Sequence, residues 1–346
     1  MTHVSIQELT KIYPGSVTPA LDRLSLEIAS GELTALLGPS GCGKTTTMKM
    51  IAGLLETTSG DILFNDRSIL RDKPENRGVV MVFQNYLLFP YMSVADNVGF
   101  GLKMRKTDPA EIKRRVGEML DLVKLPDVGD RKPSALSGGQ QQRIALARAL
   151  IVQPEVLLLD EPLSNLDAHL RFEMRDLIRQ LQQDMGITTI FVTHDQEEAV
   201  VLADRVALIL DGQMKQYDTP DAFYKRPVDE ATARFFGGHN FIPGTSNGGV
   251  FDGLLGKLVL PDGAISGPGK LTFRPENVRI GHTYGEANNL DATLEDVIYL
   301  GTQTRLKLRV GDVGVEAVVN PNEVEGFSPG DGVPIHLPPA TLWVIA

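Results

Sequence analysis

One short segment combines glycines, a lysine and a threonine in a spacing that can bind nucleotide phosphates. It lies between an apolar run at 33–37 and a helical pattern, and its residues are Gly38-Pro39-Ser40-Gly41-Cys42-Gly43-Lys44-Thr45-Thr46. Glycines let the backbone turn tightly so that successive N–H groups face phosphate oxygens, and the dipole of the following helix favours the same anion. The pattern predicts that Lys44 contacts the β- and γ-phosphates and that Thr45 ligates Mg²⁺.

A second candidate site is a pair of acids at the end of an apolar run. Residues 156–159 are Val-Leu-Leu-Leu, and Asp160 and Glu161 follow directly. A phosphate loop of this kind is paired with a metal-holding aspartate at the end of a neighbouring buried strand. We therefore expect Asp160 to hold Mg²⁺, directly or through water, and Glu161 to orient and polarise the attacking water.

A third segment puts a serine and two glycines at the start of a predicted helix, in the order Leu136-Ser137-Gly138-Gly139-Gln140. The serine hydroxyl and the free N–H groups of such a helix start form a second anion site. One nucleotide seldom needs two γ-phosphate sites on a single surface. The arrangement therefore predicts that two copies of the chain close face to face, each lending Ser137 to the nucleotide of the other.

These residues need a scaffold of buried strands and helices. Continuous apolar runs, typical of strands buried on both faces of a parallel sheet, lie at 33–37, 79–83, 156–159 and 189–192. Helix-start signals lie between them: Asp108 with Glu111 precedes a helix over 112–125, and Asp195 with Glu198 precedes another. Strands that alternate with helices predict a doubly wound α/β core.

The character of the sequence changes near residue 237. Beyond it the chain is rich in Gly, Pro and Asn, with short alternating runs such as residues 305–310. This pattern predicts a small all-β domain. We expect an N-terminal domain at 1–237 and a C-terminal domain at 238–346.

The composition excludes several classes of protein. The 346 residues hold 34 Lys+Arg against 44 Asp+Glu, a net charge of −10, which argues against a nucleic-acid partner. The apolar stretches fall far short of the about 18 residues that a membrane-spanning helix needs. The single cysteine, Cys42, favours a reducing cytoplasm. Because it lies in the phosphate loop, backbone N–H groups predict a depressed thiol pKa and inactivation by N-ethylmaleimide that ATP prevents.

The order of these motifs resembles that of the ATP-binding-cassette ATPases over about the first 235 residues. The phosphate loop resembles their Walker A motif, and the run ending in Glu161 resembles Walker B. The other matches are Gln84 as the Q-loop, Leu136 to Gln140 as the signature, Ser164 to Asp167 as the D-loop and His194 as the switch histidine. The resemblance implies an α/β P-loop NTPase with a RecA-like core and a helical subdomain at about 86–153.

The resemblance also implies a role for each site residue. Catalysis is expected from Lys44, Gln84, Glu161 and His194, and Mg²⁺ ligation from Thr45, Gln84 and Asp160. Nucleotide contacts are expected from residues 38–46, from Ser137, Gly138, Gly139 and Gln140, and from Asp167. Tyr13 either stacks on the adenine or packs over the turn at Pro14-Gly15.

Two further segments, at 273–279 and 295–301, resemble parts of the small β-barrel (TOBE-like) regulatory domain of bacterial importer ATPases of the maltose, glycerol-phosphate, polyamine and sulfate type. Residues 166–171 resemble the sugar-importing branch, whereas residues 235–242 are closer to the polyamine type. The expected solute is a sugar, a polyol or a related organic compound. A polyamine or inorganic-anion importer is the alternative, and a soluble ATPase without a transport role is a different class.

The importer hypothesis implies particular partners and a place in the cell. The chain would form a head-to-tail homodimer that encloses two ATP molecules with Mg²⁺. It would bind two membrane-spanning permease subunits. An extracytoplasmic solute-binding protein would be part of the full complex and deliver the solute to them. We expect a peripheral protein at the cytoplasmic face of the bacterial inner membrane.

Overall fold

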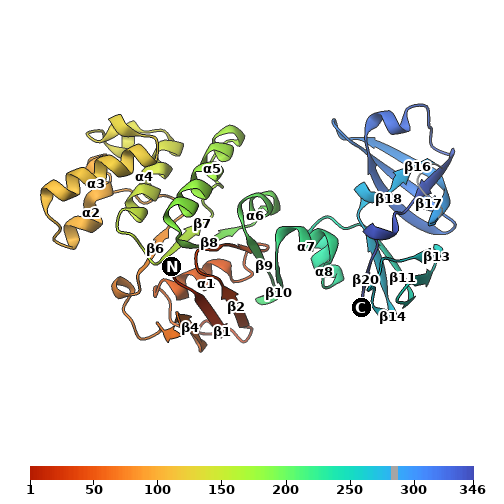
Figure 1. Ribbon diagram of the computed structural model, residues 1–346, viewed down its shortest axis with the longest axis horizontal. Helices are drawn as coiled ribbons and strands as arrows, with labels where there is room; N and C mark the ends of the chain where they lie inside the picture. The colour runs from red at the N-terminus through yellow and green to blue at the C-terminus, as the bar shows by residue number, and fades with distance from the viewer. Residues whose placement is uncertain (282–286) are drawn as a thin grey trace. The chain divides into compact units, whose positions relative to one another are not determined.

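The computed structural model describes residues 1–281 and 287–346, which form two compact units, Met1–Pro220 and Asp221–Ala346. The N-terminal unit combines two sheets with a cluster of helices, and the C-terminal unit is mainly β-structure (Figure 1). Among the described residues, no helix is both long and apolar enough to cross a membrane.

A six-stranded sheet forms the centre of the N-terminal unit. Five of its strands are parallel and the edge strand β10 is antiparallel to β9. Every residue of β3 and β8 is buried, as the apolar runs predict. Across the sheet the strands are β10 (Gln213–Asp218), β9 (Arg205–Leu210), β3 (Leu33–Leu37), β8 (Thr188–Thr193), β7 (Val156–Asp160) and β6 (Val79–Val82). The predicted α/β core is confirmed.

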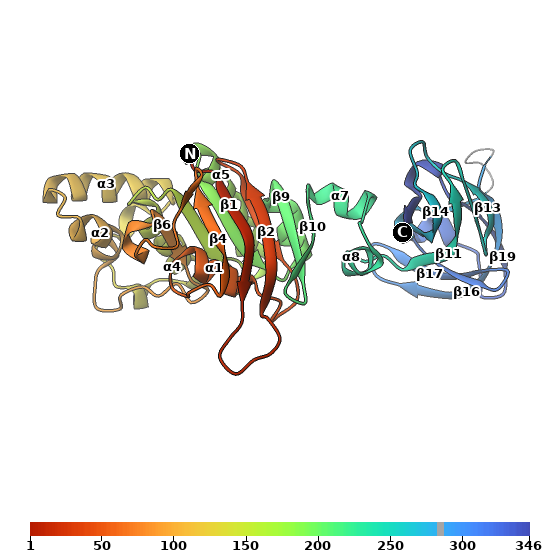
Figure 2. The same ribbon diagram turned by 90° about the horizontal axis from the view of Figure 1, so that it is seen from below.

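A second, antiparallel sheet packs with this core. Its strands follow the order β2 (Leu21–Ile28), β1 (Val4–Lys11), β4 (Ser59–Phe64) and β5 (Arg67–Ser68). The first three of them lie side by side in Figure 2. One apolar cluster contains Ile6 of β1, Val192 of β8 and Met48 of helix α1 (Lys44–Ile51). The phosphate-loop helix is therefore anchored by buried side chains from both sheets.

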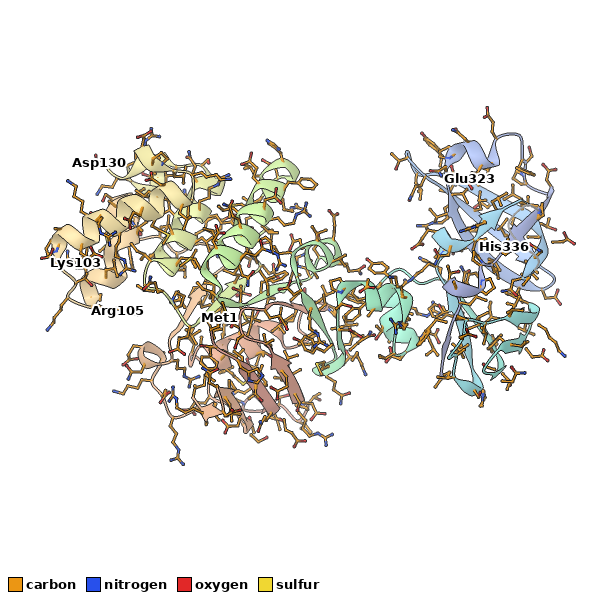
Figure 3. The ribbon with its side chains drawn as sticks, in the orientation of Figure 1. Met1, Lys103, Arg105, Asp130, Glu323 and His336 are labelled. Atoms are coloured by element: carbon orange, nitrogen blue, oxygen red, sulfur yellow. The ribbon has the colours of Figure 1, made fainter. Side chains whose placement is uncertain are left out.

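Three helices form a subdomain beside the central sheet: α2 (Val94–Met104), α3 (Pro109–Leu122) and α4 (Gly138–Leu150). Lys103, Arg105 and Asp130 lie on it, at some distance from the strands (Figure 3). Asp108 caps α3 by accepting from the N–H groups of Ala110 and Glu111, as predicted. The expected reciprocal bond from Glu111 is not made, because its carboxylate pairs with Arg114 instead.

Helices α5 (Ala168–Met185) and α6 (Gln196–Leu202) follow the strands β7 and β8. Asp167 and Asp195 are their N-caps: the side chain of Asp167 accepts from one backbone N–H of the first turn, and that of Asp195 accepts from two. The loops that precede these helices therefore have defined geometry at the carboxyl edge of the sheet, where ligands bind in open α/β sheets.

The C-terminal unit encloses one apolar core between two antiparallel sheets, which confirms the predicted all-β domain. Phe251 and Leu271 enter the core from the first sheet, and Leu294 and Leu306 enter it from the second. The first sheet is β13 (Gly256–Val259), β12 (Val250–Gly253), β11 (Asn240–Asn247), β14 (Ser266–Phe273) and β20 (Trp343–Ile345). The second is β15 (Arg279–Ile280), β19 (Gly332–His336), β16 (Asn289–Tyr299), β17 (Thr304–Val310) and β18 (Val313–Val319).

Two short helices, α7 (Pro220–Lys225) and α8 (Glu230–Phe235), precede the β-strands of this unit. The sequence predicts a domain boundary at 237, whereas the compact units meet at 220–221. The difference has a physical cause in Arg274, which is buried after β14. Its guanidinium donates to the carbonyls of Phe223 (2.8 Å), Tyr224 (3.1 Å), Ala233 (3.3 Å) and Phe236 (2.5 Å).

We expect the substitution Arg274→Leu to destabilise the C-terminal unit. Burial lowers the pKa of this guanidinium, and four carbonyls accept hydrogen bonds from it. Removing the donors leaves buried carbonyls unpaired and should lower the free energy of unfolding by about 2–4 kcal/mol. The measurement is urea unfolding followed by the fluorescence of Trp343, the only tryptophan of the chain.

The matched control for this prediction is Arg309→Leu. Arg309 lies in the same unit, but it is exposed and forms an ion pair with Glu295 at the surface. Its removal should leave the unfolding midpoint unchanged, since exposed ion pairs contribute little. Equal midpoints for the Arg274 variant and this control would contradict the role given to Arg274.

Candidate functional site

The phosphate loop connects β3 to α1 and depends on glycine at two tight positions. A Cβ atom on Gly38 would lie 2.1 Å from the carbonyl oxygen of Ile209, and one on Gly43 would lie 2.6 Å from that of Ala20. Gly43 also has a φ of 104°, in the region that favours glycine. The loop therefore has the conformation that its glycine spacing predicts, with Pro39, Ser40 and Gly41 exposed at its tip.

Lys44 is buried at the first turn of α1, with 5% of its surface exposed. Its ammonium donates to the carbonyl oxygens of Gly38 (2.6 Å) and Pro39 (2.8 Å) and lies 3.7 Å from Cys42 Sγ. No carboxylate pairs with it among the ion pairs of the described residues. A buried cation with only neutral acceptors fits a phosphate, which would provide the missing negative charge.

Thr45 of α1 and Asp160 at the end of β7 lie close together, as the two motifs predict. Thr45 Oγ1 donates to Asp160 Oδ1 over 3.3 Å. Burial raises the pKa of Asp160, and the hydroxyl of Thr45 partly offsets this effect. A hydroxyl and a carboxylate are hard oxygen ligands of the kind that Mg²⁺ prefers. The pair therefore fits the metal of a magnesium nucleotide.

Glu161 lies between two of the other three predicted catalytic residues, Gln84 and His194. Its Oε2 accepts from Gln84 Nε2 (3.2 Å), and its Oε1 lies 3.4 Å from His194 Nδ1. Glu161 has a φ of 47°, an uncommon conformation for a residue with a side chain, just after β7. The structure thus joins three residues that are far apart in the sequence. Gln84 bonds to Glu161 here, and its predicted ligation of Mg²⁺ stays a prediction.

The backbone of the Q-loop is held by hydrogen bonds that the sequence did not indicate. Tyr86 and Leu87 have φ values of 57° and 47°. Arg148 of α4 donates to both of their carbonyls, over 3.0 and 2.9 Å, and Asn165 Nδ2 donates to that of Gln84 over 3.1 Å. Two successive left-handed residues persist only where the surroundings hold them. Nothing local in the sequence marks Arg148 for this role.

Tyr13 lies beside the start of α1. Its hydroxyl is 3.2 Å from Thr46 Oγ1, and 40% of its surface is exposed. The ring therefore has an accessible surface next to the phosphate loop. This position suits an adenine-stacking residue, which remains a prediction for Tyr13.

The signature segment has an exposed and capped helix start. Ser137 Oγ accepts from the N–H of Gln140 (3.3 Å), and Gln140 Oε1 accepts from the N–H of Ser137 (3.0 Å). Ser137 and Gly138 are exposed, and Gly139 lies under Leu170. Among the hydrogen bonds of the described residues, none joins this segment to the phosphate loop. Likewise, among the described residues, the hydrogen bonds of Asp167 are with Leu170 and Arg171 of its own helix start. Both segments are thus available to a second molecule.

The prediction of a depressed pKa for the Cys42 thiol is wrong. The thiol is buried, with 4% of the residue exposed, and burial raises its pKa above the ordinary value. The nearby Lys44 ammonium and backbone N–H groups act in the opposite direction but are the smaller effects. The sequence argument took account of the local N–H groups and not of the desolvation by the surrounding core.

We therefore expect Cys42 to react slowly with N-ethylmaleimide at neutral pH. A raised pKa lowers the fraction of thiolate, which is the reacting form, and burial limits access. The rate should be well below that of free cysteine and should rise after denaturation in urea. Mass spectrometry of the labelled chain measures both rates. Labelling of the folded chain as fast as free cysteine would contradict this prediction.

These contacts define a class of protein. A phosphate loop after a buried strand, an acid pair at the end of a strand two places along the same sheet and a capped serine–glycine helix in a separate helical subdomain are the parts of an ATP-binding-cassette ATPase. Comparison with known proteins gives the same result. Residues 21–164 match the family model described as ABC transporter, and residues 271–345 match the TOBE domain.

One relative extends the match over 97% of the chain. The spermidine/putrescine import ATP-binding protein of Pseudomonas fluorescens is 42% identical, over 97% of this chain and 96% of its own. The diacetylchitobiose uptake ATP-binding protein of Streptomyces coelicolor is 49% identical, over 68% of this chain and 63% of its own. A solved dimer of the cassette MJ0796 with ADP and phosphate has a TM-score of 0.57 at 29% identity, covering 63% of this chain and 98% of its own.

The chain therefore belongs to the ABC transporter family of ATPases. Within that family it groups with the import ATP-binding proteins that carry a C-terminal TOBE domain.

Proposed function

We propose that this chain is the ATP-hydrolysing subunit of a bacterial polyamine importer, bound peripherally at the cytoplasmic face of the inner membrane. The observation that supports this best is the match to a spermidine/putrescine import protein over 97% of the chain, which includes both the ATPase and the TOBE domain. The sugar-uptake relative aligns over a smaller share, 68%. The findings thus favour the polyamine alternative over the sugar that we expected first.

One polyamine-like segment also has a defined place in the fold. Asn240, within residues 235–242, is buried at the start of β11. Its amide donates to the carbonyl of Glu316 (2.9 Å) in β18, and its Oδ1 accepts from the N–H of Glu316 (2.8 Å). The segment therefore joins the two sheets of the C-terminal unit. The resemblance concerns the construction of that unit, and no solute contact is implied.

In the proposed cycle two copies close around two ATP molecules. Lys44 of one copy binds the phosphates, and the Ser137 helix start of the other copy binds the same γ-phosphate. Thr45 and Asp160 would hold Mg²⁺, with Gln84 as a further ligand, and the metal would neutralise phosphate charge. ATP drives closure because it binds the closed pair better than the open one.

Glu161 is the proposed group that orients and polarises the attacking water. Its carboxylate is held by Gln84 and His194, so its direction is defined before ATP arrives. His194 is expected to contact the γ-phosphate and this water. Hydrolysis removes the phosphate that joins the two copies, and they separate again.

The proposed contact with the permease subunits lies after Gln84. Leu87, Phe89 and Tyr91 are exposed apolar side chains, and Tyr91 is 92% exposed. Because Arg148 holds the backbone of Leu87 and stacks on Phe89, closure at the nucleotide would shift this surface. An exposed apolar patch of this kind suits a protein partner.

A sugar importer is the second candidate function. It is favoured by residues 166–171 and by the diacetylchitobiose relative. The test is uptake by proteoliposomes that contain the chain, its permease subunits and its solute-binding protein. ATP-dependent uptake of labelled spermidine or putrescine supports the proposal, with Glu161→Gln as the inactive control. Uptake of diacetylchitobiose or of an inorganic ion alone would replace it.

A further inference from the structure

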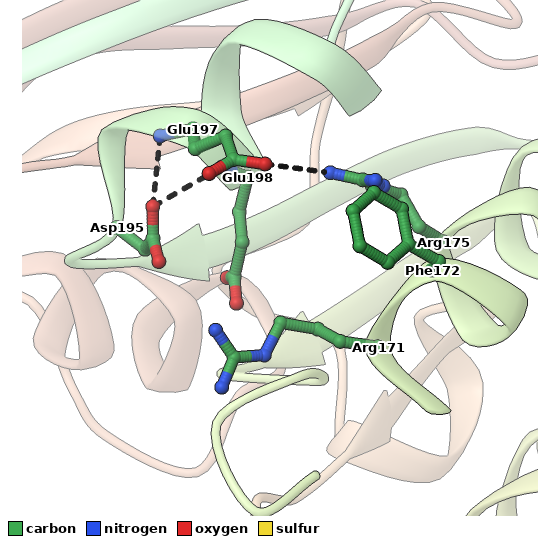
Figure 4. Close-up of a pocket in the computed structure, with 6 residues that line it drawn as sticks. All are labelled: Arg171, Phe172, Arg175, Asp195, Glu197 and Glu198. Carbon is green, nitrogen blue, oxygen red and sulfur yellow. Dashed lines mark hydrogen bonds and ion pairs between the residues drawn. The ribbon is translucent and has the colours of Figure 1, made fainter. Parts of the chain in front are cut away.

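A pocket of about 110 Å³ lies between the first turns of α5 and α6. Helix α5 begins directly after Asp167, and α6 begins two residues after His194. The pocket thus connects the helices that follow two loops of the ATPase site. Figure 4 shows the side chains that line it, which are Arg171, Phe172, Arg175, Asp195, Glu197 and Glu198.

The α6 side of the pocket is bonded to the loop that carries His194. Thr193 Oγ1 donates to Glu198 Oε2 (2.6 Å) and accepts from the N–H of Asp195 (2.9 Å). These two bonds flank His194 and hold its backbone. Glu198 is 5% exposed, and its carboxylate is therefore a buried extension of the histidine loop into the pocket.

The α5 side of the pocket is bonded to the segment from Ser164 to Asp167. Arg171 Nη2 donates to the carbonyl of Leu166 (3.1 Å), next to the N-cap Asp167. The guanidinium lies opposite the Glu198 carboxylate in Figure 4. Its Nε is buried and has no hydrogen-bond partner among the described residues. Arg171 is also one of the charges that lower the pKa of Glu198, against the larger effect of burial, which raises it.

The charges of the pocket do not suit a separate ligand. Two guanidinium groups and three carboxylates line it. Because charges of both signs are present, the pocket favours neither an anion nor a cation. Arg175 already pairs with Glu197 (3.4 Å) and stacks on the ring of Phe172. Arg171 and Glu198 face each other between the histidine loop and Leu166, without a direct ion pair between them among the described residues.

We propose that Arg171 and Glu198 are positioning residues that couple the His194 loop to the segment 164–167. A shift of His194 toward the γ-phosphate would move Glu198, and the charge opposite would move Arg171 and the Leu166 backbone with it. Because segment 164–167 is available to a second copy, the state of one nucleotide site is transmitted to the other. The inference rests on the proposed dimer, and it is independent of the solute.

The test compares variants of the chain within the co-purified transporter assembly. Glu198→Gln keeps an acceptor for Thr193 but removes the charge that faces Arg171, and Arg171→Lys keeps the charge but removes the fork of donors. Each should reduce kcat by about 2- to 30-fold and bring the Hill coefficient for ATP toward unity. ATP affinity and thermal midpoint should stay close to those of the unaltered assembly. Glu197→Gln, in the same pocket, is the matched control and should behave as the unaltered chain.

Two further variants separate positioning from a merely structural role. Glu198→Asp retains the charge and should restore part of the cooperativity lost in Glu198→Gln. The double variant that combines Glu198→Gln with Arg171→Lys should lose no more kcat or cooperativity than the more affected single variant. Both residues act through one link, so their effects should not add. Losses that multiply, or variants with unaltered cooperativity, would overturn the coupling. If the assembly that contains the unsubstituted chain shows no cooperativity for ATP, the proposed dimer mechanism is overturned, and this inference with it.

Discussion

Replacing Glu161 by Gln should lower kcat for ATP hydrolysis by about 10²- to 10⁴-fold, the usual contribution of a positioned proton acceptor. The amide has the same shape as the carboxylate, so the contacts with Gln84 and His194 are largely retained. The affinity for ATP should therefore change by no more than a few-fold. Single-turnover hydrolysis and nucleotide binding measure the two quantities separately.

The same variant should accumulate as an ATP-bound dimer, because closure remains possible while hydrolysis does not. Light scattering of the chain with and without ATP would detect the doubled mass. Glu155→Gln is the matched control, since Glu155 precedes the opposite end of the same strand, β7. Normal turnover in Glu161→Gln, or equal losses in the control, would remove Glu161 from the proposed role.

Replacing Lys44 by Ala should weaken ATP binding by about a hundredfold or more, because hydrogen bonds to charged groups contribute about 1.5–3 kcal/mol each. Among the described residues, Lys44 bonds to two carbonyls and to Cys42 Sγ of its own loop and to no carboxylate. The fold should therefore survive the substitution, and the thermal midpoint without ATP should be unaltered.

The decisive measurement for Lys44 is the shift of the thermal midpoint on adding ATP. A ligand at a hundred times its Kd stabilises the folded chain by about 2.7 kcal/mol, and at the same ATP concentration this gain should fall to about 0.4 kcal/mol or less in Lys44→Ala. Lys49→Ala, on the exposed face of the same helix, should keep it. A normal ATP-induced shift in Lys44→Ala would show that the phosphates bind elsewhere.

The parts of the site that the sequence predicts well are those with local geometry. The phosphate loop is contiguous, so its glycines, Lys44 and Thr45 determine the turn and the helix start together. The strand before Asp160 is marked by its apolar run. Parallel packing of β7 against β8 then brings Glu161 and His194 to the same edge of the sheet.

The parts that the sequence misses depend on distant contacts. Arg148 reaches carbonyls that lie 61 and 62 positions earlier, and no local pattern predicts such a bond. Arg274 likewise attaches α7 and α8 to the C-terminal unit across 38 to 51 positions. For Cys42 the local N–H groups predict one direction of the pKa, while burial by the folded core produces the other.

The identity of the solute does not follow from local sequence patterns, because the chain itself offers no solute contact among the described residues. Among the described residues, those of the proposed ATPase site suit a nucleotide, and the polyamine-like segment around Asn240 joins two sheets. Specificity in importers of this kind lies largely in the permease and solute-binding subunits. The preference for a polyamine therefore comes from the full-length match to a spermidine/putrescine relative and not from a solute contact.

The most direct test of the central claim is co-purification of the tagged chain from gently solubilised membranes, with ATPase activity assayed on the assembly. We predict two multi-spanning subunits by mass spectrometry, and ATP hydrolysis that a solute-binding protein stimulates when loaded with spermidine or putrescine. A soluble ATPase without membrane partners would contradict the importer function. An assembly stimulated only by another solute would contradict the polyamine.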